Sequence, residues 1–421
     1  MISAVLFVSF VVMLLLNVPI VLSLGGSALI AMLYGGLPLS VLPVNVYAGI
    51  SKFVLLAIPF FVLAGNIMEK GGISQRLISF VDSMVGHKKG GLAIVCVVVC
   101  CFFAAISGSG PATVAALGVI LIPAMTKAGY GAGFSSALMA SAGSIGIIIP
   151  PSISFVVYGA IAGVSISKLF IAGIIPGCMM GAALIIVVLI ISSKKTLEEK
   201  PKASAKERLQ SFKDAFWGLL MPLIILGGIY GGVFTPTEAA AVSVVYGLFT
   251  GLFIYKEIKL KDLVYILISS AKQSAGIMIV IACASLFAWV CTTEGIAAMA
   301  SELLLRISGN KYGFLLIVNI LLLIAGCFID ANSAMYIFVP IMLPVALKLG
   351  YDPIAFGVMM TMNLAIGLVT PPVGLDLFVA CQISKISLSE ISKHVMPLIV
   401  VSLVVLFLIT YFPQITLFLV K

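Results

Sequence analysis

Two short polar turns interrupt an otherwise apolar chain, and both carry oxygen atoms of the kind that bind hard cations. The first is Ser-Gly-Ser-Gly-Pro-Ala-Thr at residues 107–113, and the second is Asp-Ala-Asn-Ser at residues 330–333. Hydroxyl, carboxylate and backbone carbonyl oxygens are the ligands that hard cations prefer in proteins. Asp330 is the strongest single candidate, because a charge among apolar segments is costly and tends to mark an ion or substrate pathway. The alternative is that Asp330 only caps the helix that follows it.

Each polar turn is followed by a proline pair that must end a helix. Pro150 and Pro151 close the run 143–151, and a second Pro-Pro pair closes the run 367–372. Proline cannot donate a backbone hydrogen bond, and the second proline forces the first out of the α region, so the carbonyls before each pair lose their partners. Loose carbonyls at a half-helix C-terminus, next to serine hydroxyls, suit a dehydrated Na⁺. The alternative is a pair of ordinary proline kinks.

The turns and the proline pairs belong to a stretch that occurs twice, 221 residues apart. Residues 104–176 and 325–397 share only 12 of 73 positions, yet four of the five prolines in the first copy recur in register. Proline and glycine mark where helices break, so both halves should break at the same places. Two copies of a broken-helix unit are typical of secondary transporters.

The duplication predicts two Na⁺ sites, one near Ser109 and Gly146 and one near Asp330 and Thr370. The predicted sodium ligands are Ser109, Gly146, Ile149, Pro151, Gly326, Asp330, Gly367 and Thr370. The residues predicted to bind substrate are Ser107, Gly108, Gly110, Pro111, Asn332 and Ser333. The sequence contains no phosphate loop, zinc-ligand spacing or Ser/His/Asp set. We therefore predict no catalytic residues and no enzyme, and any pumping must draw on an ion gradient.

The elements that position these residues must be membrane-spanning helices. Of the 421 residues 62% are hydrophobic and only 9% are charged, which is more apolar surface than a soluble protein of this size could bury. The segments are too long and too uniformly apolar for barrel strands, so the predicted fold class is an all-α polytopic membrane protein in a lipid bilayer. The net charge of +9 comes from Lys and Arg in short loops, which argues against a nucleic-acid partner. The eight cysteines form no CxxC pair and are expected to be packing residues.

The repeat divides the chain into two halves around one long polar stretch. The first repeat covers 1–193, with a hairpin at about 91–128 and a broken helix at about 133–165; a linker covers 194–214; the second repeat covers 215–421, with a hairpin at about 313–348 and a broken helix at about 354–382. Each hairpin is either re-entrant or two full spans, because the count of membrane crossings has the same parity in both cases. Irregular backbone at membrane depth is tolerated only where it is buried in protein or lines a cavity.

The distribution of basic residues sets the predicted orientation. The linker carries seven basic residues, which places it in the cytoplasm by the positive-inside rule. Counting spans from the linker places the loop 69–90 inside and the corresponding loop 291–312 outside. The two repeats are therefore predicted to have inverted topology, with both termini in the periplasm.

Five stretches spread along nearly the whole chain point to one family. They are 58–72 (IPFFVLAGNIMEKGG), the turn 107–113, the break at Pro150–Pro151, the run 235–240 (TPTEAA) and the run 367–374. Together they resemble the large membrane subunit of tripartite ATP-independent periplasmic (TRAP) transporters, of the DctM/SiaM type. The run 235–240 also has a structural interpretation, since Thr235 and Glu238 have the spacing of a helix capping box.

The resemblance implies an elevator-type transporter of the bacterial inner membrane, with two re-entrant hairpins and Na⁺ as the coupling ion. It also implies a separate small four-helix membrane subunit and a soluble periplasmic protein that captures the substrate. The substrates of the family are organic acids such as C4-dicarboxylates and sialic acid. The alternative is a stand-alone sodium/dicarboxylate symporter or an ion antiporter of similar architecture, which would need no binding protein.

Overall fold

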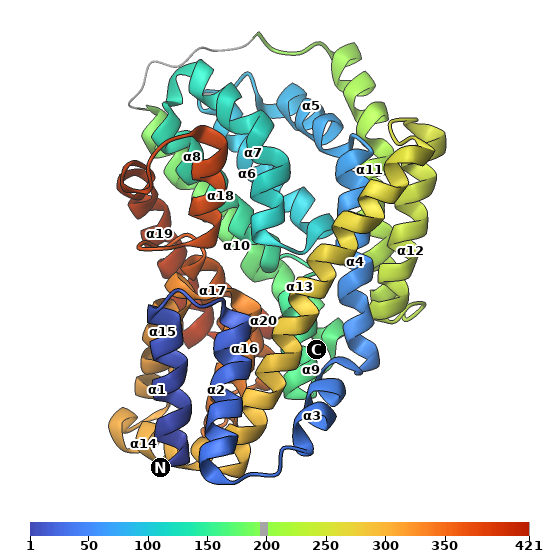
Figure 1. The fold of residues 1–421 in the computed structure, drawn as a ribbon. Coiled ribbons are helices and arrows are strands. Elements are labelled where there is room, and N and C mark those ends of the chain that lie inside the picture. Colours follow the sequence, from blue (N-terminus) through green and yellow to red (C-terminus); the bar gives the residue numbers. More distant parts are fainter. Residues whose placement is uncertain (194–200, 421) are drawn as a thin grey trace.

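The computed structural model describes residues 1–193 and 201–420, and every regular element in this part of the chain is a helix (Figure 1). Nine helices of the described residues are long and apolar enough to cross a membrane. This length and composition agree with the predicted all-α polytopic class.

The helices of the first half, with their bounds, are α1 (Ile2–Leu15), α2 (Ile20–Gly35), α3 (Val41–Ile50), α4 (Ala57–Lys70), α5 (Ile73–Val85), α6 (Gly91–Ser107), α7 (Gly110–Met125), α8 (Ala132–Gly143), α9 (Ile153–Ala162) and α10 (Ile166–Ser193). Those of the second half are α11 (Ala205–Tyr230), α12 (Pro236–Phe249), α13 (Leu260–Thr293), α14 (Ile296–Ser308), α15 (Lys311–Phe328), α16 (Ala331–Lys348), α17 (Pro353–Gly367), α18 (Leu375–Ser384), α19 (Leu388–Tyr411) and α20 (Pro413–Leu417). Short 3₁₀ or π turns extend four of these helices: η1 (Phe53–Leu56), η2 (Thr126–Tyr130), η3 (Ser144–Ile147) and η4 (Thr250–Ile254).

The helices break at both proline pairs, as predicted. After α8 and η3 the chain is non-helical until α9 begins at Ile153, and after α17 it is non-helical until α18 begins at Leu375. Ser152 stabilises the first break, because its hydroxyl donates to the carbonyl of Ile147 at 2.6 Å and accepts from the backbone N–H of Phe155 at 3.3 Å. The break is therefore a defined connection between two half-helices.

The half-helices on the two sides of each break pack in different neighbourhoods. In the first half of the chain α8 packs against α6 and α7, whereas α9 packs against α16 and α17 of the second half. In the second half α17 packs against α15, whereas α18 packs against α7 and α8 of the first half. The two broken helices thus interlock the two halves of the chain.

A long helix provides the wall opposite the broken helices. Helix α13 has 34 residues, runs through most of the length of the molecule, and packs against α2, α3, α4 and α16 (Figure 1). Asn66 of α4 donates to the hydroxyl of Ser270 on α13 at 2.8 Å, which fixes the register of the two helices. Helix α12 also packs against α4.

Three stretches that the sequence analysis treats as loops contain helices. The stretches 69–90 and 291–312 contain α5 and α14, whose apolar residues follow a helical period on one face only, so a search for uniformly apolar segments misses them. The predicted linker 194–214 is helical from Ala205, because Ser204 and Glu207 form a capping box that starts α11. Residues 194–200 of that linker lie outside the described residues.

Candidate functional site

The first polar turn is held in shape by its own hydroxyl groups. Helix α6 ends at Ser107 and α7 begins at Gly110, with Gly108 in the left-handed region at φ +62°. The hydroxyls of Ser107 and Thr113 lie 2.8 Å apart, and Thr113 donates to the carbonyl oxygen of Ser109 at 2.8 Å. Three oxygen atoms therefore gather within one turn of chain.

This turn lies directly against the first proline break. A Cβ added to Gly146 would lie 2.8 Å from the carbonyl oxygen of Ser109 and 2.9 Å from Oγ1 of Thr113. A Cβ added to Gly108 would lie 2.8 Å from the carbonyl oxygen of Pro151. The structure thus brings Ser109 next to Gly146, and Pro151 next to Gly108. Ile149 packs elsewhere: its side chain and its backbone nitrogen face Gly177 of α10.

The second polar turn places Asp330 at the N-cap of α16. Its carboxylate accepts from the backbone N–H groups of Asn332 and Ser333 at 3.0 Å each, and also from the hydroxyl of Ser333. The capping geometry considered from the sequence is therefore present. Asp330 also lines the central cavity described below, so the carboxylate is both a helix cap and a cavity wall.

Two glycines lie in close contact at the second break. A Cβ added to Gly326 of α15 would lie 3.0 Å from the Cα of Gly367 at the end of α17. The N–H of Gly374 donates to the carbonyl of Cys327 at 3.2 Å. The hydroxyl of Thr370 donates to the carbonyl of Ile366 at 2.7 Å, and within the described chain no hydrogen bond joins it to Asp330. The structure thus pairs Gly326 with Gly367 but does not join Thr370 to the carboxylate.

A cavity of about 520 Å³ lies between the two polar turns. Of the residues predicted to bind substrate, Gly108 and Pro111 from the first turn and Asn332 from the second line this cavity. The other three do not: Ser107 lines a smaller adjoining cavity, Ser333 is buried behind Asp330, and Gly110 packs against the carboxylate of Asp376. Asp376 is fully buried, and neither of its oxygens has a hydrogen-bond partner in the described part of the chain.

Four helices point their N-terminal ends at the cavity. The lining includes the first residues of α7, α9, α16 and α18, among them Pro111, Ser154, Asn332 and Leu375. The hydroxyl of Ser154 donates to Oδ1 of Asn332 at 3.1 Å, so the first break and the second turn also touch each other. A helix N-terminus carries a positive partial charge that favours a bound anion. The cavity walls also carry the carboxylates of Glu69 and Asp330, and Asp330 already accepts from two N–H groups at the start of α16, so the site combines features that attract an anion with features that attract a cation.

The opposite wall contains polar residues that the sequence analysis missed. Asn66 and Glu69 of α4 and Gln273 of α13 line the cavity together with the two turns. Nε2 of Gln273 lies 3.5 Å from Oδ1 of Asn66. The signal that could have identified Glu69 is the one used for Asp330, a carboxylate in an apolar span. Asn66 and Gln273 carry no such signal, because single amides in spanning helices are also common packing residues.

The family model of the DctM component of the tripartite ATP-independent periplasmic transporter matches residues 7–415 of this chain. The chain is 44% identical over 376 residues to the C4-dicarboxylate TRAP transporter large permease protein DctM of Pseudomonas aeruginosa, covering 89% of this chain and 88% of that protein. It is 38% identical over 371 residues to the sialic acid TRAP transporter large permease protein SiaM of Vibrio cholerae, covering 88% of this chain and 87% of that protein. It is also 43% identical to the isethionate TRAP transporter permease protein DctMQ of Oleidesulfovibrio alaskensis, matching 98% of this chain but only 66% of that longer protein.

Two solved transporter structures have a similar fold at low sequence identity. The YdaH transporter of Alcanivorax borkumensis superposes with a TM-score of 0.67 at 14% identity, covering 97% of this chain and 98% of that one. MtrF of Neisseria gonorrhoeae superposes with a TM-score of 0.57 at 14% identity, covering 88% and 83%. These likenesses confirm an all-helical, multi-span transporter fold, and the family match confirms the resemblance seen in the sequence motifs. The chain belongs to the DctM family of large permease subunits of TRAP transporters, and it is a transporter permease rather than an enzyme.

Proposed function

We propose that this permease is the translocation subunit for Na⁺-driven uptake of an organic acid. The observation that carries the proposal is the central cavity, which both polar turns line and at which four helix N-termini end. Positive helix ends favour a carboxylate or another organic anion over a neutral or cationic solute. The relatives named above are a C4-dicarboxylate, a sialic acid and an isethionate transporter, which supports the same class of cargo.

The first proposed Na⁺ site is formed by the first turn and the first break. The carbonyl oxygen of Ser109 and the hydroxyl of Thr113 face Gly146, and the hydroxyl of Ser107 lies 2.8 Å from that of Thr113. A side chain at Gly146 would fill this cradle, so the absence of a Cβ keeps oxygen atoms within reach of a small ion. Thr113 joins the predicted ligands on this geometry. The side chain of Ile149 packs against Gly177 of α10, so a ligand role for this residue would use its backbone carbonyl.

The second proposed Na⁺ site lies between the second turn and the second break. Asp330 supplies the negative charge, and the C-terminal ends of α15 and α17 meet at Gly326 and Gly367. The negative ends of two helix dipoles and one carboxylate together favour a cation here. Thr370 lies on the same break, and its hydroxyl oxygen keeps lone pairs free for a ligand role while it donates to Ile366.

The proposed architecture of the protein is two inverted repeats that work as an elevator. The interlocked bundle of α6–α9 and α15–α18 would carry the cavity, while α4, α12 and α13 would form the static wall. The protein would lie in the inner membrane, with the linker 194–214 in the cytoplasm and both termini in the periplasm. Each hairpin would then enter and leave on one side, with its polar turn buried at membrane depth.

The proposed partners are a small four-helix membrane subunit and a periplasmic substrate-binding protein. The length of the DctMQ relative beyond the region it shares with this chain supports a membrane partner. The name of the family supports a periplasmic component.

The test is uptake into proteoliposomes that contain this permease, with and without the two partners. The vesicles are offered radiolabelled succinate, N-acetylneuraminate or isethionate under an inward Na⁺ gradient. The proposal expects uptake of at least one of them only when all components and the gradient are present. Uptake by the permease alone would favour a stand-alone symporter, and efflux under the same gradient would favour an antiporter.

A further inference from the structure

The seam between α4 and α13 contains a row of cavities that leads away from the central one. The central cavity is lined on this side by Glu69 of α4 and by Gln273 of α13. A second cavity of about 170 Å³ is lined by the same two residues together with Lys70, Tyr265 and Ser269. The two cavities therefore share a wall.

A third cavity continues the row to the ends of both helices. It measures about 260 Å³, shares Lys70 and Tyr265 with the second, and is otherwise lined by residues 257–266 at the start of α13. The lining thus moves steadily toward the C-terminus of α4 and the N-terminus of α13. The row ends beside the polar segment 255–259, on the side that the charge distribution assigns to the cytoplasm.

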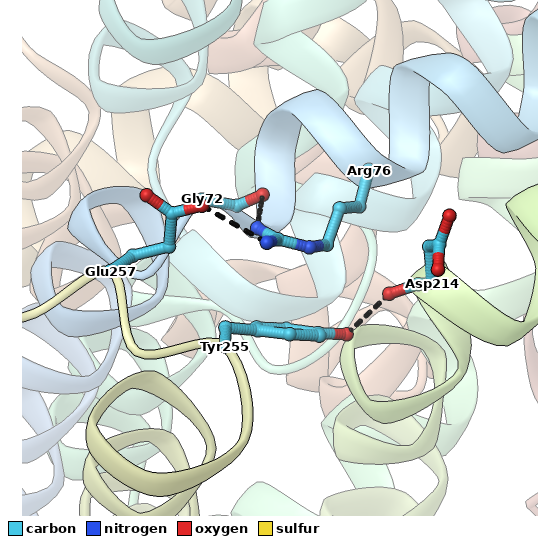
Figure 2. Close-up of polar contacts among 5 residues, drawn as sticks. All are labelled: Gly72, Arg76, Asp214, Tyr255 and Glu257. Atoms are coloured by element: carbon cyan, nitrogen blue, oxygen red, sulfur yellow. Dashed lines mark hydrogen bonds and ion pairs between the residues drawn. The ribbon is translucent and has the colours of Figure 1, made fainter.

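Lys70 is the free charge of the outer part of this row. Glu257 is ion-paired with Arg76 at 3.0 Å (Figure 2). Asp262 caps α13, where its carboxylate accepts from the backbone N–H of Lys259 at 2.9 Å. Within the described part of the chain no carboxylate lies within 4 Å of the Lys70 ammonium, which lies 5.8 Å from the centre of the Tyr265 ring. Lys70 also interacts electrostatically with Glu69 on the same wall. The outer cavities therefore present a cation that is held in no close ion pair.

We propose that this row is an exit route for the anionic cargo and that Lys70 is an anion-binding residue on it. The inference rests on the proposed function, because that function defines the cargo as an organic anion held in the central cavity. Lys70 would draw the anion from the helix N-termini past Glu69, whose carboxylate lies at the junction of the first two cavities. The Lys70 ammonium offsets that repulsion, while in the outer cavity Glu257 is ion-paired with Arg76 and Asp262 accepts from the backbone N–H of Lys259.

The test measures the charge preference of the route without any transported substrate. Ser269→Cys places a thiol in the second cavity, in the permease assembled with its membrane partner. The rate of thiol modification is compared for membrane-impermeant methanethiosulfonates carrying a sulfonate or a trimethylammonium group, in inside-out and right-side-out vesicles. The eight native cysteines are free, so protein without the new cysteine supplies the background.

We expect modification from the cytoplasmic face of inside-out vesicles, with the anionic reagent favoured. Lys70→Gln should lower the ratio of anionic to cationic rates by roughly tenfold, the effect of one unit charge a few ångströms away in a partly aqueous site. Lys70→Arg should keep the ratio. The matched control is Lys261→Gln, which removes an exposed lysine at the N-terminal end of α13 that lines none of the three cavities. This variant should leave the ratio unchanged.

An unchanged ratio in Lys70→Gln, or reaction only from the periplasmic face, would overturn the proposed route. Uptake by the unaltered protein is measured separately. Absence of uptake together with the expected charge preference would contradict the proposed function and leave an anion pathway, so the two failures are distinguishable.

Discussion

Asp330 is the residue at which a structural and a functional role coincide. Its carboxylate accepts hydrogen bonds from Asn332 and Ser333, as a helix cap should, and it also faces the central cavity. A cap needs only an acceptor oxygen, which Asn supplies about as well as Asp. An ion site that depends on charge needs the anion itself. The two roles therefore make different demands on the same side chain.

Asp330→Ala should weaken Na⁺-driven uptake severely while expression and membrane insertion persist. If the carboxylate couples ion and substrate with a typical 1–3 kcal/mol, the apparent Na⁺ affinity should fall roughly 5- to 150-fold. Asp330→Asn should retain part of the activity, because it keeps the cap and one oxygen ligand. Uptake measured against Na⁺ concentration separates the outcomes. A wild-type curve for Asp330→Asn would leave only the capping role.

The sequence predicted the residues that are marked by a local proline break or a polar turn. It missed the residues that reach the cavity only because distant helices pack together. Ser109 and Gly146 were paired correctly in space because a proline break and a serine-rich turn are strong local signals 37 residues apart. Glu69 and Gln273 reach the same cavity from helices that look like ordinary spans, and only packing brings them there. The sequence could not predict that the side chain of Ile149 packs against Gly177 of α10, so the predicted ligand role of this residue rests on its backbone carbonyl alone.

The second break depends on two helix ends that meet without side chains. A Cβ on Gly367 would lie 2.5 Å from the Cα of Gly326, so neither helix can carry a larger residue there without moving. Such overpacking costs about 1–3 kcal/mol in a closely packed interior.

Gly367→Ala should therefore lower the thermal unfolding midpoint of the purified protein and reduce uptake together. Gly227→Ala in α11 is the matched control, because an added Cβ there meets nothing within 4 Å. The comparison uses unfolding monitored in detergent and uptake in proteoliposomes. Equal midpoints for the two variants would mean that the Gly326–Gly367 contact does not restrain the break.

Helix α5 packs against α6 and α11, and a polar cluster at its N-terminal end adds a further attachment. Arg76 donates to Glu257 and to the carbonyl of Gly72, and its guanidinium lies 4.0 Å from the centre of the Tyr255 ring (Figure 2). The hydroxyl of Tyr255 donates to the carbonyl of Asp214 on α11 at 2.7 Å. The cluster joins α5, α11 and the segment before α13, which lie far apart in the sequence.

A double-mutant cycle of Arg76→Ala and Glu257→Ala should show a coupling of about 0.5–1 kcal/mol in the free energy of unfolding, the upper range for a partly exposed pair. The pair Arg306–Glu302 within α14 is the control, because its side chains are 77% and 69% exposed. Its coupling should be smaller. Both cycles are measured by unfolding in mixed micelles. Equal coupling energies would show that the Arg76–Glu257 pair stabilises the protein no more than an exposed ion pair does.

The elements themselves were predictable where they are uniformly apolar or broken by proline. Both breaks and the start of α12 were predicted; there Thr235 and Glu238 form the capping box. Helices α5 and α14 could not be recognised from apolar length, since polar residues on one face lower their average hydropathy. The early start of α11 depends on a capping box inside a strongly charged stretch, where composition alone suggests a linker.

The whole molecule is two halves joined through their broken helices. Because α9 packs with α16 and α17 while α18 packs with α7 and α8, the two polar turns lie in one packed bundle. An ion bound at the first turn would order the same bundle that holds the second. Linkage of this kind makes ion binding and substrate binding reciprocal. We therefore expect transport to depend on more than one Na⁺.

The initial rate of uptake as a function of Na⁺ concentration shows whether transport depends on more than one Na⁺. Proteoliposomes that hold the complete system are given a fixed concentration of the transported organic acid, and Na⁺ is replaced by choline to keep the ionic strength constant. If two Na⁺ ions act together, the rate should follow a saturating, sigmoidal curve with a Hill coefficient above one, and it should be negligible in choline alone. A rate that does not change with Na⁺ concentration would contradict this expectation.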